Sequence, residues 1–84
     1  MARNPTDRRT TAMVDAVSNW VSTGQAVQAR AAADLSQGAL AKILGVSQQA
    51  VGSWETGRVL PSGQRLRKYH SWLTRNLTAP ASTK

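Results

Sequence analysis

Two short helical segments separated by a glycine constrain the fold of this chain more than any other feature. Each segment follows a serine that can cap a helix and precedes a glycine that can end one; the pairs are Ser36 with Gly45, and Ser47 with Gly57. Apolar residues recur at helical spacing in and between the segments, and they are Leu40, Ala41, Leu44, Val46, Val51 and Trp54. If all of these face one core, the second helix crosses the first steeply and keeps an uncharged polar outer face.

Three further segments show helical spacing, and none shows the alternation of a strand. They span residues 10–21, 25–33 and 63–77; the first two could be continuous through Gly24. The last carries an apolar stripe that closes the core, formed by Leu66, Tyr69, Leu73 and Leu77 with Trp72 adjacent. We predict an all-α protein, a compact bundle of five or six short helices.

The length of 84 residues allows one compact core and hardly a second. We expect a single helical domain at residues 10–77. Residues 1–9 and 78–84 are polar and lack periodicity, so they are expected to form a flexible basic arm and a disordered tail.

The charge balance points to a polyanionic partner. Eleven Lys and Arg residues against four Asp and Glu give a formal net charge of +7, so nucleic acid or an anionic membrane surface is the default partner. The absence of cysteine excludes disulfides and thiolate metal sites. No apolar run approaches the roughly 18 residues of a membrane span, and residues 1–9 do not resemble a secretory signal. We expect the protein to stay inside the cell that makes it.

The titratable side chains are scattered, without metal-ligand spacing or a carboxylate pair; they are His70, Tyr69, Glu55, Asp7, Asp15 and Asp34. His70 stands in a basic amphipathic stretch, where packing is a far commoner role than metal binding or proton transfer. We expect no enzyme activity, no metal and no cofactor.

The segment LSQGALAKILGVSQQAVGSWETGRVLPS, residues 35–62, resembles the helix-turn-helix of the phage Cro and CI repressor class, which includes the xenobiotic-response-element (XRE) family. The likeness is carried by Ala41, Gly45, Val46, Val51, Trp54, Glu55, Gly57, Arg58 and Pro61. It implies a lambda-repressor-like bundle whose helix-turn-helix spans residues 36–57 and whose folded part binds DNA. Two features depart from the family: Gly52, where the family usually has Ser or a longer side chain, and the helix before Gln25, which the minimal family domain lacks.

The resemblance also implies roles in DNA binding. Base contacts are expected from Gln48, Gln49 and Ser53, since a glutamine amide can pair with adenine N6 and N7. Phosphate contacts are expected from Gln37, Ser47, Thr56, Arg58, Lys42 and Arg65. The basic arm, with Arg3, Arg8 and Arg9, could enter a minor groove or add only electrostatic attraction. For Gly52, close approach to a base and a merely weak helix position stay equally open.

An internal ion pair is expected at Glu55, because a carboxylate facing DNA would repel it and the spacing from Val51 places Glu55 near the core rim. Repressors of this class carry an Arg–Glu pair at the matching positions, which implies Arg30 as the partner. Both residues are then structural.

The function implied by the resemblance is a sequence-specific regulator of transcription that binds double-stranded DNA, a Cro-like repressor acting by operator occupancy. An antitoxin or other protein-binding module on the same fold stays open, as does a nonspecific nucleic-acid-binding domain. We expect a weak or DNA-assisted homodimer, with a monomer also allowed, and no membrane or small-molecule partner. The expected location is the cytoplasm of a bacterial cell or of a phage-infected host.

Overall fold

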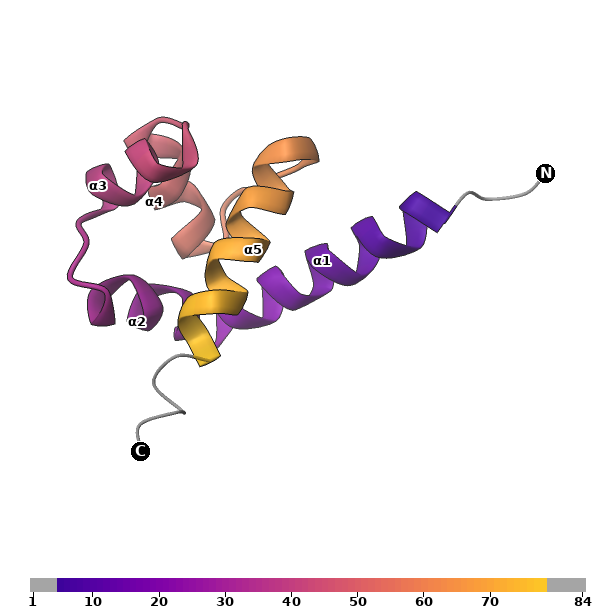
Figure 1. Cartoon of the computed structure of the whole chain (residues 1–84), viewed down its shortest axis with the longest axis horizontal. Coiled ribbons are helices and arrows are strands. Elements are labelled where there is room, and N and C mark those ends of the chain that lie inside the picture. The colour runs from indigo at the N-terminus through magenta and orange to yellow at the C-terminus, as the bar shows by residue number, and fades with distance from the viewer. Residues whose placement is uncertain (1–4, 79–84) are drawn as a thin grey trace.

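The computed structural model describes residues 5–78, and this part of the chain is all-helical (Figure 1). Its helices are α1 Pro5–Ser22, α2 Gln25–Ala32, α3 Gln37–Leu44, α4 Gln48–Thr56 and α5 Gly63–Thr78. The predicted all-α class and a bundle of five helices are thereby confirmed. Among the described helices, none has the length and apolarity needed to cross a membrane.

Serine caps and left-handed glycines set the bounds of α3 and α4, as the sequence predicts. The hydroxyls of Ser36 and Ser47 each accept a hydrogen bond at 3.0 Å from the backbone N–H three residues later. Gly45 and Gly57 end the two helices with φ of +74° and +77°, a conformation that is costly for residues with a Cβ. The turn between α3 and α4 is therefore short and sterically defined.

One core joins the inward faces of the helices. Trp54 of α4 packs against Tyr69 of α5, with ring centroids 4.9 Å apart. Hydrophobic residues from every helix are buried with them, namely Val17, Val21, Ala26, Ala29, Leu40, Ala41, Leu44, Val51, Leu66, Trp72 and Leu73. Val46 and Leu77 lie at the margin of this core, partly buried. Since α3 and α4 share the core, dense packing fixes the angle between them.

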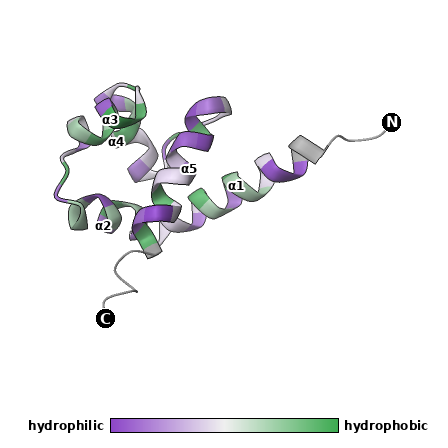
Figure 2. Cartoon of the chain, in the orientation of Figure 1, coloured by the Kyte–Doolittle hydropathy of each residue, from purple (hydrophilic) through white to green (hydrophobic). Residues whose placement is uncertain are grey.

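Helix α1 is longer than predicted, and only its later part packs on the bundle. It begins at Pro5, whereas apolar periodicity predicts a start at residue 10. Arg8 and Arg9 are exposed and thus carry no apolar periodic signal, while a proline is well suited to a first helical position. The early part of α1 extends away from the other helices (Figure 1), and it is hydrophilic at Arg8 and Arg9, after the residues drawn in grey (Figure 2). Further along, Val17 and Val21 are buried.

The N-terminal arm differs from the expectation. Arg8 and Arg9, predicted in a flexible arm, lie instead on α1 with exposed side chains. Arg3 and the predicted tail beyond Thr78 lie outside the described residues. Gly24, with φ of +83°, separates α1 from α2, so the two segments are distinct helices.

Candidate nucleic-acid interface

The outer face of α4 carries side chains that can form hydrogen bonds without bringing charge. Gln48 and Gln49 are exposed in the first turn, and Ser53 is half-buried one turn later. Thr56 is exposed, and its hydroxyl donates to the Ser53 carbonyl oxygen at 3.1 Å. The opposite side of α4 is held in the core by Val51 and Trp54. The outer face is therefore polar and rigidly placed.

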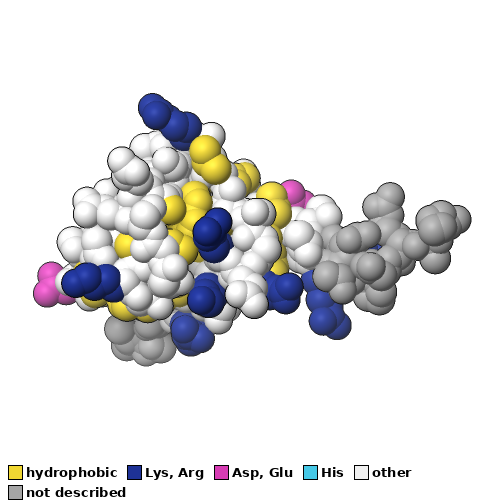
Figure 3. Space-filling view, turned by 90° about the horizontal axis from the view of Figure 1, so that it is seen from above, with side chains coloured by type: hydrophobic (Ala, Val, Ile, Leu, Met, Phe, Trp, Pro, Cys, Tyr) yellow, Lys and Arg dark blue, Asp and Glu magenta, His cyan; other side chains and the backbone are white. Residues whose placement is uncertain are grey.

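Exposed cations lie beside this face. Lys42 lies on α3, Arg58 directly after α4 and Arg65 on α5, and all three are exposed. Figure 3, seen from the side on which α3, α4 and the start of α5 lie, shows Lys and Arg side chains spread over the surface. The only acidic residue after Asp34 in the sequence is Glu55, which is buried. The surface charge around α4 is thus positive.

Other predicted site residues lie at the edge of this surface or away from it. Ser47 is exposed at the start of α4, where its hydroxyl oxygen accepts the cap hydrogen bond. Arg8 and Arg9 lie on the first turns of α1, which extend away from α3 and α4 (Figure 1). The structure therefore does not bring these two arginines to the α4 face.

Glu55 is buried at the inner side of α4, and three hydrogen bonds satisfy its carboxylate. Arg30 of α2 donates from Nε to Oε2 at 2.6 Å and from Nη2 to Oε1 at 3.1 Å. The Gln37 amide nitrogen donates to Oε1 at 3.0 Å, and Arg30 Nη1 donates to the Leu35 carbonyl at 2.8 Å. The hydrogen bond to Glu55 raises the pKa of Arg30. These contacts tie α2, the start of α3 and α4 together.

Gln37 takes part in this network, a contact that sequence reasoning missed. Its Nε2 carries a second hydrogen, so the expected phosphate contact is still chemically available and stays a prediction. A Cβ added to Gly52 would lie 3.5 Å from Gln37 Oε1, which places Gly52 against the Gln37 side chain. No sequence pattern gives this contact, because it depends on the angle at which α4 crosses α3.

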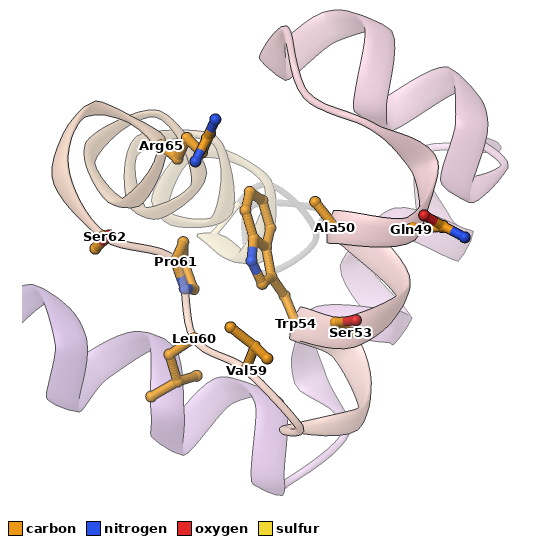
Figure 4. A pocket seen from close by; sticks show the side chains of 9 residues that line it. All are labelled: Gln49, Ala50, Ser53, Trp54, Val59, Leu60, Pro61, Ser62 and Arg65. Atoms are coloured by element: carbon orange, nitrogen blue, oxygen red, sulfur yellow. The ribbon is translucent and has the colours of Figure 1, made fainter.

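A groove runs beside the α4 face, between α4 and the loop that leads into α5 (Figure 4). Gln49 and Ser53 line its α4 side and Val59 its loop side, with Trp54 between them. The remaining lining residues are Ala50, Leu60, Pro61, Ser62 and Arg65. Sequence reasoning missed Val59, which is 53% exposed, because helical periodicity says nothing about a side chain in a loop.

Comparison with known proteins identifies the family. A family model described as Helix-turn-helix matches residues 28–71, just over half of the chain, and the match covers α3 and α4 completely. No curated protein and no solved structure matches the chain. Helix α1 lies before the matched residues. The matched span includes the capped helices, the glycine turn and both members of the Arg30–Glu55 pair. The chain therefore belongs to the helix-turn-helix family of the XRE type, which is Cro/CI-like, and is a DNA-binding regulator.

Proposed function

We propose that this protein is a sequence-specific transcriptional repressor that acts in the manner of Cro, by occupying operator DNA. The observation that carries the proposal is the outer face of α4, where uncharged hydrogen-bonding side chains are exposed and the exposed cations Lys42 and Arg65 line the grooves beside them. An α-helix fits the major groove, in which each base pair presents its own pattern of donors and acceptors. Uncharged amides and hydroxyls can read that pattern, while cations nearby hold the phosphates.

In this proposal Gln48, Gln49 and Ser53 contact base edges. Gln48 and Gln49 stand in the first turn of α4, the part of a recognition helix that enters the groove. The phosphate contacts are made by Gln37, Ser47, Thr56, Arg58, Lys42 and Arg65, which fix the register of the protein on the duplex. Arg8 and Arg9 add long-range attraction, since the early part of α1 that carries them extends away from α4.

A protein-binding role finds less support on this surface. The described residues expose large hydrophobic side chains at Ile43 and Val59, which lie on different elements, α3 and the loop after α4. Single exposed apolar residues are common on soluble proteins and do not form a docking patch. Masking a toxin would require a larger apolar face.

We further propose that two copies bind a two-fold operator as a weak or DNA-assisted homodimer. Proteins with this motif place two recognition helices in successive major grooves, one helical turn of DNA apart. The spacing of half-sites in the bound DNA therefore reports the stoichiometry.

The test is the selection of bound duplexes from a random pool at near-physiological salt, with the intact chain. We expect an enriched motif with two-fold symmetry, and a variant carrying Gln48→Ala and Gln49→Ala should enrich none. Circular dichroism checks that this variant folds, which is expected because both side chains are exposed. A pool without any enriched motif would contradict the proposal and leave nonspecific binding.

A further inference from the structure

Val59 is an apolar side chain placed beside the proposed base-reading residues. It is 53% exposed, and it lines the same groove as Gln49 and Ser53 (Figure 4). The other exposed large hydrophobic residue of the described part, Ile43 at 57%, lies on α3 in a different groove, against α5. Exposure alone is ordinary for a single apolar residue, so the position of Val59 carries the inference.

The loop that carries Val59 is fastened to α4. The Ser53 carbonyl oxygen accepts hydrogen bonds from the N–H of Arg58 at 3.1 Å and of Val59 at 3.4 Å. Pro61, two residues on, is buried. A β-branched side chain also has few rotamers. Val59 is thus held in place before any ligand arrives, and little conformational entropy is lost when it makes a contact.

The chemistry of DNA gives this side chain one partner among the base edges of the major groove. Thymine presents a C5-methyl group there, and apolar side chains recognise it by contact. We propose that Val59 reads a thymine through this methyl group, at a base pair next to those contacted by Gln49 and Ser53. The inference rests on the proposed function, because it requires α4 to lie in the major groove.

The test uses the duplex selected by the intact chain, with each thymine replaced in turn by deoxyuridine. Deoxyuridine keeps the pairing edge and lacks only the methyl group. At one thymine per half-site, we expect the dissociation constant of the intact chain to rise about fourfold, the effect of losing one buried methyl contact. The Val59→Ala variant should bind the thymine duplex more weakly and should not distinguish thymine from deoxyuridine at that position.

Ile43→Ala is the matched control, since it removes the other exposed hydrophobic side chain from a different groove. This variant should keep the full response to deoxyuridine. If Val59→Ala responds to every deoxyuridine as strongly as the intact chain does, the proposal is wrong. A selected duplex whose binding does not change with deoxyuridine at any position would also overturn the thymine contact, while leaving sequence-specific binding intact. Failure to enrich any duplex would overturn the proposed function as well.

Discussion

Replacing Glu55 of α4 by alanine removes the carboxylate that accepts hydrogen bonds from Arg30 of α2 and Gln37 of α3. Arg30 would keep only the Leu35 carbonyl at 2.8 Å, although its side chain is just 16% exposed. Leaving one charge of a buried pair without its partner destabilises a protein by about 3–5 kcal/mol. A domain of this length has an unfolding free energy of roughly 4–13 kcal/mol, so the loss is a large share of the total.

The Arg30→Met variant has the converse defect and a similar expected loss. It keeps the apolar stem of Arg30 but leaves the Glu55 side chain, 4% exposed, with the Gln37 amide as its remaining donor. The double variant removes both charges together. We expect it to lose about 1–2 kcal/mol, less than Glu55→Ala alone, because no uncompensated charge stays buried.

Urea unfolding of the intact chain, the two single variants and the double variant measures this double-mutant cycle. The fluorescence of the tryptophans reports the transition, since Trp54 and Trp72 are buried, and linear extrapolation gives the free energies. We expect the double variant to fall short of the sum of the single losses by at least about 4 kcal/mol, because two single losses of at least about 3 kcal/mol each stand against a double loss of at most about 2 kcal/mol. Additivity within about 0.5 kcal/mol would refute the assignment of Arg30 and Glu55 as a coupled pair.

Three further changes test separate parts of the structure. Gly52→Ala should raise the unfolding free energy by about 0.5–1 kcal/mol, because Gly52 lies inside a helix and the added Cβ makes an ordinary contact with Gln37. Gly57→Ala should instead lower the melting temperature, because Gly57 has φ of +77°. A loss of stability in the Gly52→Ala variant as well would contradict the reasoning. The hydroxyl of Tyr69 is buried and has no hydrogen-bond partner among the described residues. Its burial, and to a smaller extent the nearby charge of Glu55, raises the pKa of Tyr69. Tyr69→Phe should therefore stabilise the protein by about 1 kcal/mol in urea unfolding. A loss of that size would show that the Tyr69 hydroxyl does form a hydrogen bond. Arg58→Ala should weaken binding to all duplexes alike and reduce the slope of log K against log salt by about 1; a loss confined to the selected sequence would argue for a base contact instead.

Local chemistry explains why the helix-turn-helix could be predicted from the sequence. Ser36 and Ser47 cap helices through bonds to N–H groups three residues away, and Gly45 adopts a backbone conformation that few other residues tolerate. Each of these signals lies within a few residues of the feature that it sets. The expectation of an Arg30–Glu55 pair had another source, the resemblance to repressors.

The features that sequence reasoning missed depend on tertiary geometry or on the absence of a pattern. Gln37 meets Glu55 only because α3 and α4 cross at a particular angle, and the role of Gly52 follows from the same crossing. Arg8 and Arg9 in the early part of α1 are exposed, so no apolar period marks their helical state. Val59 lies in a loop, whose path is set by hydrogen bonds to the Ser53 carbonyl.

Sequence-specific binding through α4 is tested most directly by the ratio of two dissociation constants. It compares the dissociation constants of the intact chain for the selected duplex and for a shuffled duplex of the same composition, at about 0.15 M salt. The account predicts that the selected duplex binds at least about a thousandfold more tightly. Equal dissociation constants for the two duplexes would contradict it.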